Sequence, residues 1–173
     1  MKKASTYIAQ VLTRGVDHAV LVDTSRVFTA PWVRLKCQFG CAGYGQTLTC
    51  PPFSPTPDQM RSTLDSYRHG ILLHRHWKKD QKDMEKLSDV VVDLETMLFL
   101  DGYYKAFGIG SGPCAGCRTC DTTASCKHPE RARPSMEACG IDVFKTAREH
   151  NLPIRVVRER GEERDMYGLV LME

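Results

Sequence analysis

The sequence predicts an α/β layered domain in which a mixed sheet and about three helices support two cysteine-rich loops. Amphipathic helical stretches alternate with short apolar runs, which is the pattern of a layered α/β architecture. The length of 173 residues suits one domain, and a chain of this size buries a sizeable core. The eight cysteines fall between the predicted elements. We therefore treat residues 1–173 as a single domain.

The first elements are two short strands and a helix. Strands are expected at residues 19–22 and 32–36. The stretch SPTPDQM then predicts a helix start, because Thr56 caps it and Gln59 completes a capping box. Gly70 is expected to end this helix in the left-handed conformation. The apolar face of the helix comprises Met60, Leu64 and Tyr67.

A strand and a long helix are predicted next. GILLHRHW, residues 70–77, has the composition of a strand. Asp80 opens a helix whose apolar side chains repeat at alternating steps of three and four. These side chains are Met84, Leu87, Val91, Leu94 and Leu98. Further apolar residues surround the second half of this helix, so we expect it to be largely buried.

The remaining elements follow the second half of the chain. YKAFGIGSG, residues 104–112, predicts a short buried strand and a glycine-rich turn. A third helix is expected over residues 142–150, with Val143, Phe144 and Ala147 facing inward. Two strands at residues 153–159 and 166–173, joined by a charged turn, predict an antiparallel hairpin.

Composition excludes several classes of protein. No apolar run of about 18 residues is present, so we expect no membrane span. The net charge of +3 is spread along the chain, which makes nucleic acid an unlikely partner. The densest basic stretch, HRHWKK at residues 74–79, is interpreted as a solvated strand end that runs into a helix.

The compartment is predicted from the N-terminus and the cysteines together. The first 20 residues lack the apolar stretch of a signal peptide, so we expect a cytoplasmic protein. Cytoplasmic thiols are kept reduced, so eight cysteines here are expected to be metal ligands or redox groups rather than disulfides.

The second cysteine loop, residues 112–129, reads GPCAGCRTCDTTASCKHP. Its first three cysteines have the CxxCxxC spacing with which bacterial ferredoxins hold three irons of a [4Fe–4S] cluster. Here the next cysteine follows after five residues, whereas the ferredoxin pattern has three. We call its four thiols the second-loop cysteines: Cys114, Cys117, Cys120 and Cys126.

The first cysteine group comprises Cys37, Cys41 and Cys50. Three thiolates need a fourth ligand, and Cys139 is the cysteine left to supply it. The alternative is an iron whose fourth position is open to water, substrate, histidine or carboxylate. Such an iron would act as a Lewis acid rather than as a carrier.

Zinc held by the same thiols is a second interpretation, and redox thiols, disulfides or plain buried cysteines are a third. His128 could replace a cysteine in a zinc site, although a surface histidine is the commoner case. His74 and His76 share one face of a strand and could chelate a third metal, but no carboxylate is near them in sequence. Basic residues that would favour thiolates are Lys36, Arg118, Lys127, Arg131 and Arg133.

With HPERARPSMEACGIDVFKT also in view, the chain resembles a family of small prokaryotic proteins described only as predicted metal-binding proteins of unknown function. The resemblance runs from about residue 37 to residue 146. Its most specific pieces are CPPFSPTP and the pairing of CxxCxxC with RPSMEACGIDV. It implies a metal or iron–sulfur site at the first cysteine group and the second-loop cysteines, and it implies no reaction.

These observations lead us to expect an iron–sulfur protein with one or two [4Fe–4S] clusters that exchanges electrons with a redox protein partner. No flavin or nicotinamide fingerprint is present that would let the chain collect hydride itself. Two alternatives stay open: a cluster enzyme with an open iron that acts on a small substrate, and a zinc-stapled interaction module. Whether the protein is an enzyme is left open, and no hydrolase motif is present.

Overall fold

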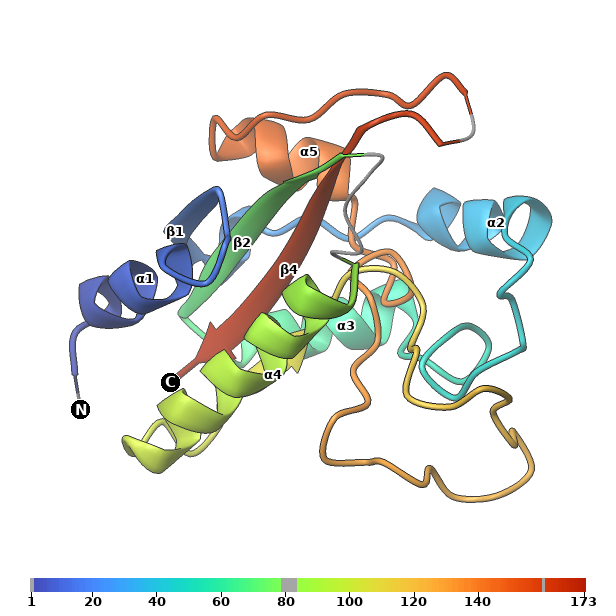
Figure 1. Ribbon diagram of the computed structural model, residues 1–173, viewed down its shortest axis with the longest axis horizontal. Helices are drawn as coiled ribbons and strands as arrows, with labels where there is room; N and C mark the ends of the chain where they lie inside the picture. Colours follow the sequence, from blue (N-terminus) through green and yellow to red (C-terminus); the bar gives the residue numbers. More distant parts are fainter. Residues whose placement is uncertain (1, 79–83, 160) are drawn as a thin grey trace.

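The computed structural model describes residues 2–78, 84–159 and 161–173 and contains one four-stranded sheet with helices on both faces (Figure 1). The α/β class is thus confirmed. The helices are α1 (Ala4–Leu12), α2 (Pro31–Gly40), α3 (Pro57–Asp65), α4 (Met84–Leu100) and α5 (Val143–Glu149), with a 3-10 turn η1 (Thr24–Arg26). The strands are β1 (His18–Asp23), β2 (His69–Trp77), β3 (Phe107–Ile109) and β4 (Arg164–Met172).

The sheet has the order β1-β2-β4-β3, and all of its strand pairings are antiparallel. The prediction of a mixed sheet was therefore wrong. After α5 the chain runs back along the sheet in an extended segment before β4 begins, so β4 is antiparallel to both of its neighbours (Figure 1). Among the described residues, a parallel pairing occurs as an isolated bridge between Gly110 and Ser135.

The two central strands are buried on both faces, which divides the core into two parts. Leu72 of β2 and Leu169 of β4 face α3 and α5, whereas Ile71 and Val170 face α1 and α4. Successive side chains of a strand point to opposite faces, so this alternation is what a sheet between two helical layers requires. The result is an α/β/α sandwich.

The N-terminal third differs most from the prediction. Helix α1 was missed, and residues 32–36, predicted as a strand, lie in helix α2. Pro31 occupies the first turn of α2, where its missing N–H leaves no bond unmade. Val33 is buried while neighbouring apolar residues are exposed, so the pattern that resembled a buried strand belongs to an exposed helix.

The start of α3 confirms the predicted capping box. The Thr56 hydroxyl accepts from the Gln59 backbone N–H, and the Gln59 side chain accepts from the Thr56 N–H. The predicted end at Gly70 was wrong, because the helix ends at Asp65 and Gly70 lies within β2. A Cβ there would come within 3.2 Å of the Val170 carbonyl, so close strand packing explains this glycine.

Helix α4 confirms the predicted apolar face, since Leu87, Val91, Leu94 and Leu98 are fully buried. Phe99 and Leu100 at its C-terminal end are exposed, so burial does not extend all round the helix. The predicted start at Asp80 and the side chain of Met84 lie outside the part of the chain that the structure describes.

The C-terminal region is confirmed in part. Strand β3 is present, and α5 begins where Asp142 accepts a hydrogen bond from the Lys145 N–H. Val143 and Ala147 are buried, whereas Phe144 is half-buried beside a surface groove. The predicted hairpin was wrong, because residues 153–159 form an extended segment outside the sheet and β4 pairs with β2 and β3.

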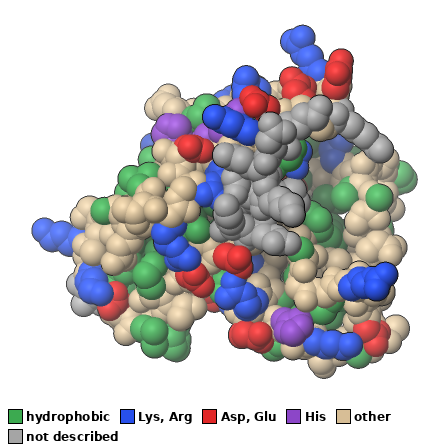
Figure 2. All heavy atoms as spheres, in the orientation of Figure 1, with side chains coloured by type: hydrophobic (Ala, Val, Ile, Leu, Met, Phe, Trp, Pro, Cys, Tyr) green, Lys and Arg blue, Asp and Glu red, His purple; other side chains and the backbone are tan. Residues whose placement is uncertain are grey.

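Charges of both signs are interspersed on the face shown in Figure 2. The basic stretch at residues 74–79 is not a solvated strand end throughout, because His74 and Arg75 are buried between β1 and β4. Among the described residues, no helix has both the length and the apolar character that a membrane crossing needs.

Candidate metal centre

The second cysteine loop connects the end of β3 to the segment before α5 and has no regular secondary structure (Figure 1). Its four cysteines are half-buried and line one small pocket with Gly116 and His128. The pocket has a volume of about 20 Å³, enough for one water-sized guest. The fold thus brings four cysteines that are spread over thirteen residues to the lining of one pocket.

The base of this loop is fixed to the scaffold. The Gly110 N–H donates to the Pro134 carbonyl at 2.8 Å, and the Met136 N–H donates to the Gly110 carbonyl at 3.1 Å. Glu95 of α4 accepts two bonds from the Arg133 guanidinium, at 2.6 and 2.8 Å. Both side chains of this pair are largely buried. The two ends of the loop are therefore held while its tip is exposed.

The two cysteine regions adjoin each other. Thr47, Leu48 and Thr49, which lead into Cys50, line the same small pocket as the second-loop cysteines. Figure 1 shows the turn that follows α2 and the second cysteine loop on the same side of the molecule. A guest in this pocket would therefore contact both regions of the chain.

The first cysteine group is held together by α2 and by one arginine. Cys37 lies in α2, and its Sγ is 3.9 Å from the Glu137 carbonyl. The prediction that all cysteines lie outside the regular elements was therefore wrong for Cys37. One nitrogen of Arg34, Nη1, contacts the carbonyls of Ser54, Pro55 and Ala138 at 3.3, 2.8 and 2.9 Å. Arg34 thereby fastens α2 to the segment after Cys50 and to the turn before Cys139.

The thiols of the first cysteine group influence one another. The pKa of the Cys37 thiol is raised above its usual value, mainly by burial, then by Cys41 and Glu137, and least by Cys50, while Arg34 lowers it. Backbone hydrogen bonds connect the same segments, since the Cys41 N–H donates to the Cys37 carbonyl at 3.3 Å and the Gly45 N–H donates to the Pro51 carbonyl at 2.8 Å. The structure thus brings this group into one region.

A local motif occurs in both cysteine regions. The sequence Cys-Ala-Gly stands at residues 41–43 and again at 114–116. In each copy the glycine N–H points at the cysteine sulfur, at 3.4 Å for Gly43 and 3.5 Å for Gly116. Hydrogen bonds of this kind stabilise thiolates and the reduced form of iron–sulfur clusters. The repeated Cys-Ala-Gly is a sequence signal for this contact that the cysteine spacing alone does not reveal.

Cys139 has a different environment. It is fully buried in the apolar core beside Met60 and Leu64. Burial raises the pKa of its thiol to about 12, which disfavours the thiolate that a metal needs. Its role as the fourth ligand of the first cysteine group stays a prediction.

Two of the basic residues near the cysteines are already paired. Arg131 contacts Asp89 and Asp93, and Arg133 contacts Glu95. Their charge is largely neutralised by these carboxylates, so these two arginines do little to favour thiolates. Lys36, Arg118 and Lys127 are exposed.

Within the described residues, no three His, Cys, Asp or Glu side chains already surround a metal-sized centre. The donor set nevertheless fits a thiolate-bound metal or cluster, because four cysteines and His128 are among the residues that line one pocket. A single ion matches the pocket volume as it stands, and a cluster needs the exposed tip of the loop to open. A larger pocket of about 520 Å³ adjoins this site and shares Cys114, Gly116 and His128 with it.

The histidines predicted as a weak third site have partners that only the fold reveals. Asp165 of β4 lies opposite His76 and accepts hydrogen bonds from both His74 and His76, at 3.1 and 3.0 Å. His18 of β1 lies opposite His74, and their Nδ1 atoms are 2.9 Å apart. These side chains satisfy one another by hydrogen bonds rather than surround a metal-sized centre.

Comparison with known proteins gives one match. A family model described as "Predicted metal-binding protein (DUF2284)" matches residues 20–172. No curated protein and no solved structure matches the chain. The matched range includes both cysteine regions, the whole of β2, β3 and β4, and all of β1 except its first two residues.

Proposed function

Because the chain belongs to the DUF2284 family of predicted metal-binding proteins, we propose that it is an iron–sulfur protein that exchanges electrons with a partner protein. The observation that carries the proposal is that the four second-loop cysteines line one pocket. The family supports metal binding, and the choice of iron–sulfur over a single ion comes from the CxxCxxC spacing. We place the protein in the cytoplasm, where its thiols stay reduced.

The second-loop cysteines are the proposed ligands of a [4Fe–4S] cluster. When bound, the cluster supplies one-electron chemistry. The chain supplies four thiolates and the Gly116 N–H, which donates toward the Cys114 sulfur. The paired Arg133 and Glu95 keep the base of the loop fixed, so the loop tip can open for the cluster while the scaffold stays in place.

The first cysteine group is the proposed site of a second cluster. Backbone hydrogen bonds bring the segments that carry its three cysteines together, and the Gly43 N–H donates toward the Cys41 sulfur. The fourth position of this site is filled by Cys139 or is open, and we favour an open position because Cys139 lies in the core. The count of one or two clusters depends on this group.

A second candidate function is favoured by the pocket of about 520 Å³ beside Cys114. Its walls are the glycine-rich turn before the second cysteine loop, part of α4, His128 and the segment at residues 131–133. A pocket of this volume is of the size that holds a small molecule. The alternative is therefore an enzyme that binds a small substrate next to the metal centre.

The test is metal analysis of protein that is produced and purified without oxygen. We expect about four irons and four sulfides per cluster, a brown colour, and loss of one cluster in Cys117→Ser. Ser125→Ala, an exposed position on the same loop, is the matched control and should keep the full iron content. A colourless protein with stoichiometric zinc and no sulfide would refute the proposal in favour of a zinc-stapled module.

A further inference from the structure

Helix α2 carries an exposed apolar stripe, which we call the α2 face: Trp32, Leu35 and Phe39. The spacings of three and seven residues place these side chains on one side of the helix. They are 47%, 55% and 79% exposed. The inward side of the helix is occupied by Val33 and Arg34, which contact the body of the protein. An ordinary surface helix packs its apolar side inward, whereas α2 exposes its apolar side to solvent.

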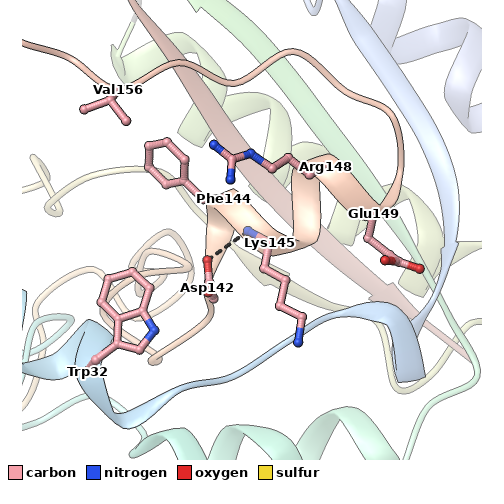
Figure 3. Close-up of a pocket in the computed structure, with 7 residues that line it drawn as sticks. All are labelled: Trp32, Asp142, Phe144, Lys145, Arg148, Glu149 and Val156. Carbon is pink, nitrogen blue, oxygen red and sulfur yellow. Dashed lines mark hydrogen bonds between the residues drawn. The ribbon is translucent and has the colours of Figure 1, made fainter.

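The α2 face continues into a groove against α5. Trp32, Phe144 and Val156 are gathered around a hollow of about 680 Å³. Figure 3 shows the rings of Trp32 and Phe144 and the Val156 side chain bordering the same space. Val156 is 65% exposed, so this apolar surface is open to a partner. A groove lined by aromatic rings is suited to take an apolar anchor side chain from another protein.

Basic side chains surround this apolar surface. Lys36 on α2 and Lys145 and Arg148 on α5 are all exposed. Of the two acidic groups at the groove, Glu149 pairs with Arg26 at 2.8 Å, whereas Asp142 accepts from the backbone N–H of Lys145 and keeps its charge. The three cations outnumber the Asp142 carboxylate, so the rim of the α2 face has an excess of positive charge around an apolar centre, which is complementary to an acidic partner.

We propose that the α2 face is the docking surface for a small acidic electron-carrier protein. The inference rests on the proposed function, because an electron carrier is needed only if the metal centre is redox active. Cys37 lies on the same helix, less than two turns from Trp32, so a partner on this face would be next to the first cysteine group. Electron exchange there oxidises one protein by one electron and reduces the other by one, with no bond made or broken.

The test measures binding of flavodoxin, a small acidic carrier, by isothermal titration calorimetry at low and high salt. Leu35→Glu places a negative charge in the centre of the α2 face, and we expect it to weaken binding about tenfold or more. Leu100→Glu, an exposed apolar position at the end of α4, is the matched control and should bind like the wild type. Wild-type binding should weaken as salt rises.

Three results would overturn the proposal: no binding by the wild type, equal binding by Leu35→Glu and the wild type, or a wild-type dimer that Leu35→Glu dissociates. The last result, measured by light scattering, would assign the face to a second copy of this chain. Iron and sulfide content is measured on the same samples. A protein that holds no iron but still binds flavodoxin refutes the proposed function alone. A protein that holds intact clusters but does not bind flavodoxin refutes the docking surface alone.

Discussion

Replacing Arg34 by alanine tests whether one side chain holds the first cysteine group together. Its Nη1 atom lies 2.8 Å from the Pro55 carbonyl, 2.9 Å from the Ala138 carbonyl and 3.1 Å from the Ser54 hydroxyl. One nitrogen has two hydrogens, so about two of these bonds are made at full strength. With a charged donor each is worth about 1.5 to 3 kcal/mol, and we expect Arg34→Ala to lower the free energy of unfolding by about 3 kcal/mol.

Urea unfolding followed by circular dichroism measures this loss, and Lys36→Ala, an exposed position on the same helix, should stay within about 0.5 kcal/mol of the wild type. Metal analysis supplies the second readout. Arg34→Ala should reduce the metal held by the first cysteine group and leave the second-loop cysteines loaded. If Arg34→Ala were as stable as Lys36→Ala, the idea that Arg34 links these segments would be wrong.

Three further outcomes are expected. Cys139→Ala should keep the full metal content and lose about 1 kcal/mol of stability, because the side chain fills the core; loss of metal would make Cys139 a ligand after all. Glu95→Ala leaves the largely buried Arg133 charge without its carboxylate and, among the described residues, with only the Pro129 and Ala132 carbonyls as acceptors. It should cost about 3 kcal/mol in urea unfolding, and a double-mutant cycle with Arg133→Ala should show strong coupling. Hydrogen bonds to Asp165 and then to Glu163 raise the pKa of His76. The charged His76 therefore adds its full contribution to the free energy of unfolding below the ordinary histidine pKa, and this contribution is lost as pH rises through the raised pKa. Unfolding free energies from pH 5 to 9 should therefore fall less in His76→Gln than in the wild type, and an unchanged profile would contradict this.

Elements whose signals are local could be predicted from the sequence. The capping box of α3 depends on residues three apart, and the apolar face of α4 repeats over several turns. Helix α2 could not be predicted, because its apolar side chains point outward and carry the pattern of a buried strand. The predicted hairpin failed for a related reason, since strand pairing depends on partners that lie far away in the chain.

The candidate site divides in the same way. The spacing of the second-loop cysteines predicts a shared guest, and the fold places them around one pocket. The contacts of Arg34 with Ala138, 104 positions away, have no local signal. Asp165 meets His74 and His76 only because β4 pairs with β2 in one register. The burial of Cys139 likewise follows from packing that the count of cysteines does not reveal.

The position of β4 has a consequence for how the protein is made. This strand pairs with both β2 and β3, yet it follows every cysteine in the chain. During translation the thiols emerge from the ribosome before the sheet that orders them is complete. Metal that binds before β4 is synthesised would therefore meet an unfinished scaffold, so we expect both cysteine regions to be ordered only after β4 has joined the sheet.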